Sequence, residues 1–226
     1  MDSIITTRIK KTFLSEKPRE LSILIAILST LILLFFSALC WKDQSLYLWS
    51  AAIPENVLEG GEYWRLWTAV LVHADMRHFL SNAILFGFFS YLLYGYFGFG
   101  VFPLLAFVFG GVTNFVSILT YPDHIRLVGA SGLVYLMAGF WLTSYLLIER
   151  RLGLKRRLLH ALGVGLIVLM PTSLQSNVSY RTHAIGLVFG ILLALIVFIR
   201  MKDSIRSAEV LEYELEATIH SEWGPN

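Results

Sequence analysis

Long uncharged, mostly apolar runs alternate with short polar segments along the chain. The first run covers 21–41 and follows a basic segment at 1–20. At about 1.5 Å per residue, a helix of this length crosses a hydrocarbon core of ~30 Å. The run is long for the apolar part of a signal peptide, and no small-residue cleavage motif followed by a polar mature domain is apparent. It therefore predicts a retained membrane helix.

The longest uncharged run, 79–122, is about twice the length of one crossing. Three glycines and Pro103 near its middle predict a break between two helices. Three further runs follow, of which the second is short and interrupted by glycine. The predicted membrane helices cover 21–41, 79–94, 102–120, 131–148, 158–171 and 182–199.

The composition supports this pattern. Of the 226 residues, 56% are hydrophobic and 15% are charged, which is too apolar for a soluble domain of this size. We expect an all-α polytopic membrane protein with six helices at 21–200, a short N-terminal segment at 1–20 and an acidic tail at 201–226. In the tail, Leu211, Leu215 and Ile219 recur every four residues and predict a short amphipathic helix.

The basic residues indicate orientation. Five of the 18 lysines and arginines lie in the loops that precede the second, fourth and sixth helices, and the other 13 lie at the termini and in the link after Ile148. By the positive-inside rule, both termini are cytoplasmic. These residues border apolar runs and form no stripe with aromatic residues, so no nucleic-acid partner is expected. The single Cys40 excludes an intrachain disulfide and a cysteine metal site.

The loop at 42–78 is neither a clean crossing nor an ordinary polar loop. It is rich in tryptophan and tyrosine, whose amphipathic rings favour the boundary between water and lipid. Glu62 precedes Arg65 by three residues, close enough for an ion pair that would pin the segment. Two independently solvated charges are the alternative.

Ser131 stands at the head of the fourth predicted helix, between Gly129 and Gly132. The glycines leave room for a substrate carbonyl to approach, and a helix N-terminus offers free N–H groups where negative charge develops. An acyl-transfer nucleophile needs this environment. The same small residues also suit simple helix packing, so the serine motif alone does not decide between the two interpretations.

Other polar residues stand at similar depth at the heads of helices. His78 and Asn82 share one face of the second helix, Tyr135 lies one turn after Ser131, and His183 opens the sixth helix. Polar residues in membrane helices usually face the bundle interior. Each histidine alone is explained as well by an interhelical hydrogen bond, and Tyr135 by packing. Small residues that would bring the fourth and sixth helices together, and so carry His183 toward Ser131, are Gly132, Gly139, Gly186 and Gly190.

The absence of metal-binding and acidic motifs excludes two classes of protease. The chain contains no His-Glu-x-x-His sequence of a zinc protease and no pair of acids within the predicted helices, as an aspartyl protease needs. Between 132 and 202 the only acid is Glu149, at the far end of the fourth helix. A hydrolase at this site would therefore use a serine–histidine dyad, with packing by Tyr135 orienting the imidazole in place of a carboxylate. Neither a metal ion nor another cofactor is expected.

The complete motif set resembles that of the rhomboid intramembrane serine proteases. It comprises Glu62-x-Trp64-Arg65, His73-x4-His78-x3-Asn82, Gly129-x-Ser131-Gly132 with Tyr135, and His183-x2-Gly186-x3-Gly190. The resemblance implies a Ser131–His183 dyad, with His78, Asn82 and the Ser131 N–H stabilising the oxyanion. It also implies that Glu62, Arg65 and His73 support a first loop that dips into the outer leaflet. Thr182 stands where the family often has alanine, a small change that leaves the dyad in place.

The expected protein is a multi-pass serine endopeptidase of a bacterial inner membrane that cleaves other membrane proteins in or near their transmembrane segments. Its partners would be these substrates and the lipid bilayer; the oligomeric state stays open. One alternative is a processor dedicated to a single C-terminal sorting tail. Another is a catalytically silent rhomboid-like protein that binds and escorts transmembrane segments. A small-solute transporter is disfavoured, because no pair of interrupted helices recurs in the two halves of the chain.

Overall fold

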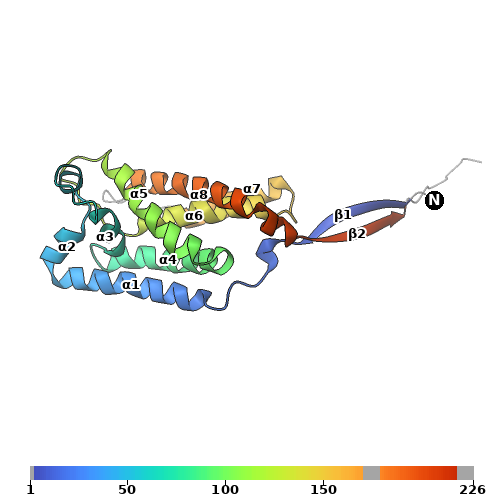
Figure 1. The fold of residues 1–226 in the computed structure, drawn as a ribbon, viewed down its shortest axis with the longest axis horizontal. Coiled ribbons are helices and arrows are strands. Elements are labelled where there is room, and N and C mark those ends of the chain that lie inside the picture. Colours follow the sequence, from blue (N-terminus) through green and yellow to red (C-terminus); the bar gives the residue numbers. More distant parts are fainter. Residues whose placement is uncertain (1–2, 170–178, 218–226) are drawn as a thin grey trace, which may run out of the picture.

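The computed structural model describes residues 3–169 and 179–217 as a helical bundle with a two-stranded ribbon at one end (Figure 1). The helices are α1 (Ser22–Lys42), α2 (Gln44–Ser50), α3 (Arg65–Leu71), α4 (Met76–Phe97), α5 (Ala106–Ile118), α6 (Ser131–Ile148), α7 (Leu154–Leu169) and α8 (Tyr180–Ser207). Short helical turns are η1 (Phe13–Ser15), η2 (Glu55–Glu59) and η3 (Gly100–Leu105), and the strands are β1 (Ser3–Lys11) and β2 (Val210–Ala217).

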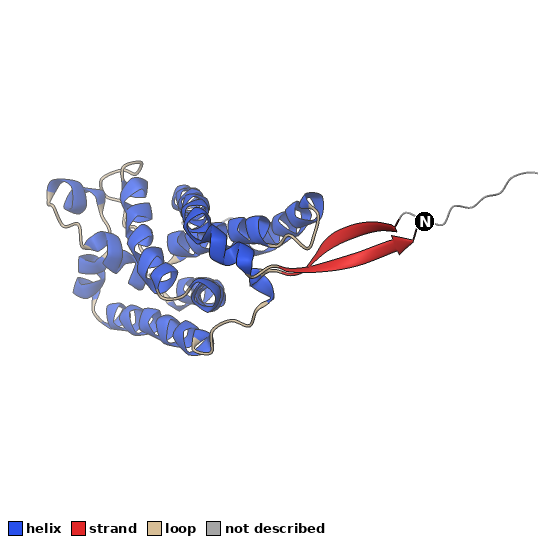
Figure 2. Ribbon diagram, turned by 45° about the vertical axis from the view of Figure 1, so that its right-hand side comes forward, coloured by secondary structure: helices blue, strands red, loops and turns tan. Residues whose placement is uncertain are grey.

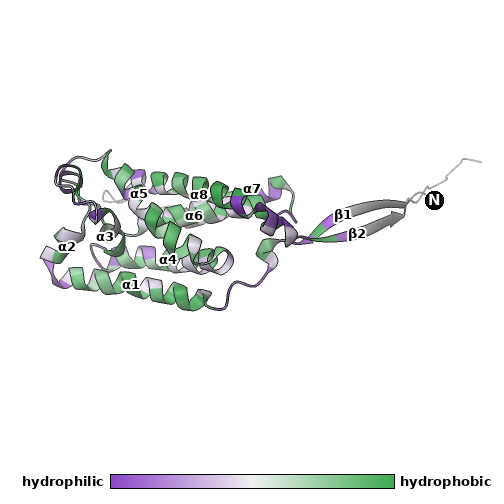
Figure 3. Cartoon of the chain, viewed as in Figure 1, coloured by the Kyte–Doolittle hydropathy of each residue, from purple (hydrophilic) through white to green (hydrophobic). Residues whose placement is uncertain are grey.

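Five helical segments of the described chain are long and apolar enough to cross a membrane: α1, α4, η3 with α5, α6 and α8. Their outer surfaces carry apolar side chains, most densely on α1 and α8 (Figure 3). The chain is thus an integral membrane protein, and its largely helical architecture confirms the predicted all-α polytopic class; the described residues contain five candidate spans, so the predicted count of six is not confirmed. The predicted fifth crossing corresponds to α7, which has 16 residues as described and is the shortest of these helices.

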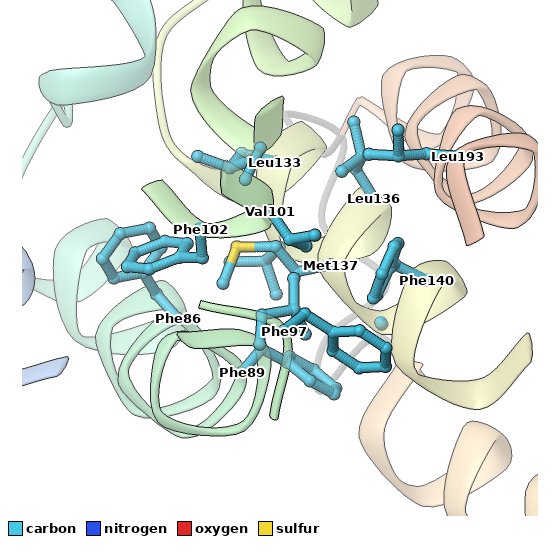
Figure 4. Packing of buried hydrophobic residues seen from close by; sticks show 14 of the residues in the cluster. Phe86, Phe89, Phe97, Val101, Phe102, Leu133, Leu136, Met137, Phe140 and Leu193 are labelled. Carbon is cyan, nitrogen blue, oxygen red and sulfur yellow. The ribbon is translucent and has the colours of Figure 1, made fainter. Parts of the chain in front are cut away.

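Helix α6 lies at the centre of the bundle. Its Leu136, Met137 and Phe140 are fully buried and meet aromatic side chains of α4 (Figure 4). Phe97 packs edge-on against Phe140, with ring centroids 5.0 Å apart. Phe89 completes this part of the core. The helix that carries Ser131 is therefore surrounded by packed neighbours, which fix its position.

Helices α6 and α8 make the closest contact in the bundle, as the glycine pattern predicts. A β-carbon added at Gly186 would overlap the carbonyl oxygen of Gly132, and one at Gly190 would overlap that of Leu136. At Gly139 it would lie 2.5 Å from the carbonyl oxygen of Leu187. The two backbones are in direct contact, because these three positions lack a side chain.

Several predicted boundaries shift. Helix α4 begins at Met76 rather than Phe79, because the Asp75 carboxylate accepts a hydrogen bond from the His78 N–H and caps the helix. Helix α7 begins at Leu154 and includes basic residues assigned to a link. Helix α8 continues to Ser207, well past the end of its apolar run, because charged residues suit a helix as well as a loop once it leaves the hydrocarbon region.

The predicted amphipathic helix in the tail is wrong. Residues Val210–Ala217 form β2, which pairs antiparallel with β1 near the start of the chain. Leu211 and Leu215 fit a period of two as well as a period of four, and the partner strand lies about 200 residues away in sequence. Ile219 lies outside the described residues. The two strands leave the bundle at the end opposite α2 and α3 (Figures 1 and 2).

Candidate active site

Backbone hydrogen bonds fix the segment that leads into Ser131. Leu127 pairs with Ala52 of the first loop through two bonds, of 2.9 and 3.0 Å. Two residues later, the Gly129 N–H donates to the carbonyl of Ala69 in α3 over 2.9 Å. The first loop and α3 therefore hold the approach to the head of α6 and decide where Ser131 begins the helix.

His73 holds the next residue of this segment. Its ring is fully buried; the Ala130 N–H donates to Nε2 over 3.2 Å, and Nδ1 lies 3.0 Å from the Ser37 hydroxyl of α1. Because Nε2 accepts, the proton of the neutral ring sits on Nδ1 and is donated to Ser37. Burial, with a smaller contribution from His78, lowers the pKa of His73 to about 3. The Trp41 indole also donates to the His73 carbonyl over 2.8 Å.

Gly129 brings its backbone against the ring of His78. Its φ of +111° is unfavourable for any residue with a side chain. A β-carbon at this position would lie 2.7 Å from Cε1 and 2.8 Å from Nε2 of His78. The imidazole is therefore packed against the chain two residues before Ser131, and glycine is required there for both conformation and space.

Asn82 lies one turn below His78 and is buried. Its side-chain amide donates to the His78 carbonyl over 2.9 Å and lies 3.5 Å from the hydroxyl of Ser81. The amide is thus held on the face of α4 that carries His78. An amide nitrogen has two N–H donors, so a substrate oxygen could accept from the one not committed to the backbone.

The turns that carry Ser131 and His183 face each other across α6 and α8. Gly132, next to Ser131, has so little room that a β-carbon there would lie 2.8 Å from Cγ2 of Thr182. One turn further along α6, the ring of Tyr135 stacks on the His183 imidazole, with centroids 4.1 Å apart and an interplanar angle of 10°. Flanking residues of the two predicted dyad members are therefore in contact.

The imidazole of His183 is positioned by stacking. Within the described residues, its Nδ1 atom is buried and has no hydrogen-bond partner. Tyr180 meets the same ring edge-on at 6.4 Å. Ser131 and His183 both keep partial exposure. Two aromatic rings therefore contact this imidazole, and its role as a catalytic base stays a prediction.

The start of α8 is fastened to the loop after α5. The Ser179 hydroxyl caps the helix by accepting from the Thr182 N–H over 3.3 Å, and it also hydrogen-bonds the Tyr121 hydroxyl. Arg181 donates to the carbonyl of Thr120 over 2.5 Å, and its guanidinium lies over the Tyr121 ring. These contacts set the position of the first turn of α8, which carries His183.

Glu62 and Arg65 form the expected ion pair in the first loop. Arg65 is buried, and its guanidinium also donates to carbonyls at the end of α2, at 2.5 Å from Leu48 and 2.6 Å from Trp49. Charge-assisted bonds to several carbonyls join α2 to α3. Because α3 holds Gly129, the pair supports the Ser131 segment indirectly.

The structure therefore groups the sequence-derived candidates at one end of the bundle. His73, His78 and Gly129 contact one another. Gly132 and Tyr135 of α6 contact Thr182, His183 and Gly186 in the first turns of α8. Sequence reasoning missed the supporting contacts of Ser37, Trp41, Asp75 and Ser179. Of these, Asp75 and Ser179 carried a usable signal, since both residue types favour helix N-caps.

Comparison with known proteins identifies the family of this chain. The family model of the rhomboid domain matches residues 60–200, so the chain belongs to the rhomboid family. A protein of Bacillus subtilis (strain 168) named "Putative rhomboid protease YdcA" is 30% identical over 170 residues, which are 74% of this chain and 83% of that protein. Family and relative together support an intramembrane protease at the level of the family.

Proposed function

We propose that this protein is an intramembrane serine protease in which Ser131 and His183 form a catalytic dyad. The observation that carries the proposal is the stack of Tyr135 on His183, one turn from Ser131 and beside the contact of Gly132 with Thr182. That packing sets the first turn of α8, which carries the imidazole, against the turn of α6 that begins with Ser131 at a glycine-flanked helix N-terminus. A nucleophile with an oriented base is the minimal unit of covalent acyl transfer.

In the proposed reaction, the Ser131 hydroxyl attacks the carbonyl carbon of the scissile peptide bond while His183 takes its proton. The peptide C–N bond then breaks, and His183 returns the proton to the leaving amine. Water, activated by the same histidine, hydrolyses the acyl-serine ester and regenerates the hydroxyl. The stack with Tyr135 keeps the ring plane fixed through these transfers.

The oxyanion would be held by the Ser131 N–H at the head of α6, by the Asn82 amide and by His78. The ring of His78 against Gly129 and the position of Asn82 on the same face of α4 support these roles. Such donors stabilise a transition state only when they are fixed in advance. The capped start of α4 at Asp75 and the segment bound by His73 supply that rigidity.

The proposed substrates are transmembrane segments of other proteins, cut near the end of the bilayer where Ser131 lies. A helix hides its carbonyls in hydrogen bonds, so the substrate must unwind locally, and helix-breaking residues near the cut should favour cleavage. We place the entry route at α7. Many of its leucines are exposed, and a β-carbon at Gly163 would contact nothing within 4 Å, so this helix is the least enclosed of the set.

The test is labelling and turnover in proteoliposomes. A serine-directed fluorophosphonate should label the wild type. The wild type should also cut a single-pass substrate into two fragments. Ser131→Ala and His183→Ala should lose both the labelling and the cleavage. Asn82→Ala should keep the label but lose ~100-fold in rate, equivalent to ~3 kcal/mol. Ser117→Ala is the control, since Ser117 is buried in α5 and, among the residues that the structure describes, its hydroxyl bonds only the Thr113 carbonyl.

Labelling that persists in Ser131→Ala would place the nucleophile elsewhere and end the proposal. A wild type that binds transmembrane segments but takes no label would instead identify a catalytically silent escort. A panel of unrelated substrates separates a general protease from a processor of one sorting tail.

A further inference from the structure

An apolar groove runs along the α1–α4 pair, whose helices lie side by side (Figure 1). Its volume is about 410 Å³. The small lining residues Ala26, Thr30 and Gly87 are less exposed than the large ones, and a β-carbon added at Gly87 would lie 3.3 Å from Oγ1 of Thr30. The large lining side chains are exposed and form the rims, which are Ile23, Ile27 and Leu31 of α1 and Ile84 and Phe88 of α4.

The groove opens toward the hydrocarbon region of the membrane. Both α1 and α4 are long and apolar enough to cross it, and the lining residues lie at 23–31 and 84–91, within these spans. An apolar lining offers water almost no hydrogen bonds, so water does not fill such a hollow favourably. The occupant must therefore be apolar along the groove, which leaves a lipid chain or another membrane helix.

The dimensions of the groove favour a lipid chain. The lining of α1 from Ile23 to Leu31 extends over ~12 Å, and a helix of that length with a diameter of ~10–12 Å occupies roughly twice the volume of the groove. Membrane helices also associate through small residues that bring their backbones together. Here the side chains of Ile84, 77% exposed, and Ile27, 52% exposed, stand between an incoming helix and Gly87. A thin, flexible acyl chain can enter between these rims.

A fixed positive charge lies one turn beyond the groove, at the end of the bundle nearer the ribbon. Arg19 precedes the lining residue Ile23 by four positions, and its N–H donates to the carbonyl of Gly95 over 3.1 Å. Its Nη1 donates to the carbonyl of Tyr94 over 3.2 Å. A β-carbon at Gly98 would meet three guanidinium atoms of Arg19 within 3.2 Å, so the end of α4 holds this group in place. The guanidinium therefore stands where both walls of the groove leave the hydrocarbon region.

An apolar groove that ends at a fixed guanidinium matches the chemistry of a phospholipid. Of the five N–H donors of Arg19, the described residues engage only Nη1, so others can bind a phosphate. Lys17 is exposed nearby, as are Glu16 and Glu20, so the segment 16–20 has no net charge and acts through this one fixed group. We propose that the groove binds one phospholipid, with an acyl chain between α1 and α4 and its phosphate on Arg19.

Such a lipid would fasten together the two helices that support one side of the candidate active site. Helix α1 hydrogen-bonds His73 through Ser37 and Trp41. Helix α4 carries His78 and Asn82. A chain packed against both helices adds contacts between them. The lipid site does not require the proposed catalytic activity, and its tests measure binding alone.

Photolabelling of the full chain in proteoliposomes tests the position of the acyl chain. A phosphatidylcholine with a diazirine in one acyl chain should label the lining residues of α1 and α4 severalfold more than Val188, Leu192 and Ile199, which are exposed on α8. Mass spectrometry of the peptides measures both yields. Unlabelled phosphatidylglycerol should compete for the labelling of the groove, whereas diacylglycerol, which has no phosphate, should not. Equal labelling of all exposed helices would identify ordinary boundary lipid and overturn the proposal, and competition by diacylglycerol would contradict the phosphate contact.

Native mass spectrometry in a mild detergent tests both parts of the site. The wild type should retain one phospholipid, and Arg19→Gln should lower its occupancy about tenfold, the effect of losing one charge-assisted hydrogen bond. Gly87→Leu, which fills the base of the groove, should lower occupancy as well. The matched controls are Lys155→Gln, at an exposed cation, and Gly100→Leu, at a glycine with open space around it.

The melting temperature of each variant shows whether it is folded. Should Gly87→Leu fail to fold, Arg19→Gln and the photolabelling still decide the question. A folded Arg19→Gln that keeps the lipid at wild-type occupancy, or a wild type that retains none, would contradict the proposal.

Discussion

At the scale of single residues, His73 connects more of the site than either predicted dyad member. Its ring joins Ser37 of α1 to Ala130, the residue before Ser131, and its carbonyl accepts from Trp41. All of these groups are buried or partly buried, so each hydrogen bond is expensive to lose. His73 is therefore a positioning residue that links the first helix to the head of α6.

Replacing this histidine should damage stability and rate together. His73→Ala leaves the Ala130 N–H and the Ser37 hydroxyl without partners and opens a cavity, so we expect a loss of ~1–3 kcal/mol in the free energy of unfolding and a lower kcat. Thermal unfolding in detergent and turnover of a single-pass substrate measure the two effects. His124→Ala, in an exposed loop, should change neither; wild-type kcat in His73→Ala would contradict the positioning role.

The same histidine gives a pH signature. Burial lowers the pKa of His73 to about 3 in the folded protein, against about 6.5 for a free imidazole. Folding therefore favours the neutral ring, and this contribution is complete above pH ~6.5 and declines as pH falls toward the folded pKa. The stability difference between the wild type and His73→Ala should shrink between pH 7.5 and pH 5. The melting temperatures of the wild type and of His73→Ala, measured across this pH range, check this expectation. A difference in melting temperature that does not change with pH would contradict a neutral buried ring.

At the residue level, the sequence selects candidates where the residue type is itself informative. The motif positions Ser131, His183 and Tyr135 could be selected because a serine between glycines and histidines at helix heads are unusual in apolar runs. Ser37 could not be selected, since a serine within an apolar helix is common and its importance comes only from the position of His73 across the fold. Contacts between distant segments leave no local pattern.

At the scale of elements, the close contact of α6 and α8 brings together the turns that carry His183 and Ser131. Gly186→Ala introduces a β-carbon that would overlap the Gly132 carbonyl, so the helices must separate. We expect a loss of ~1–3 kcal/mol in stability and a larger loss of kcat, because the stack of Tyr135 on His183 depends on that spacing. Gly100→Ala, the same change in η3 with open space around it, is the control. Equal effects of the two substitutions on turnover would refute the role of the close contact.

Element prediction succeeded where hydropathy and length are decisive and failed where they are not. The bounds of α6 follow from its uncharged run, which ends at Glu149. The end of α8 does not, because Arg200 and Lys202 end the apolar run while the helix continues outside it. The helix prediction for the tail fails for a different reason. Glutamates and apolar residues alternate at 210–217, a pattern that fits a strand, but a strand needs a partner, and that partner is β1 near the start of the chain.

At the scale of the whole molecule, the site and the terminal ribbon lie at opposite ends of the bundle. Ser131 begins α6 near the first loop, whereas Glu149, just after its other end, contacts Thr12 at the base of the ribbon. Both strands of the ribbon therefore lie at the end of the bundle opposite Ser131.

The orientation of this arrangement in the membrane is the last prediction. All five basic residues assigned to the minority side, which are Lys42, Arg65, Arg77, Arg126 and Arg181, lie at the Ser131 end. The other 13 lie toward the opposite end, and the positive-inside rule then places both termini in the cytoplasm and the dyad on the outer side. A C-terminal green fluorescent protein fusion should fluoresce and a C-terminal alkaline phosphatase fusion should be inactive in bacterial cells, while a cysteine at Asp123 should react with a membrane-impermeant maleimide from outside. An active phosphatase fusion would show that the orientation is the opposite one. Cleavage would then be expected at the cytoplasmic ends of substrates, and the sizes of the fragments would test this independently.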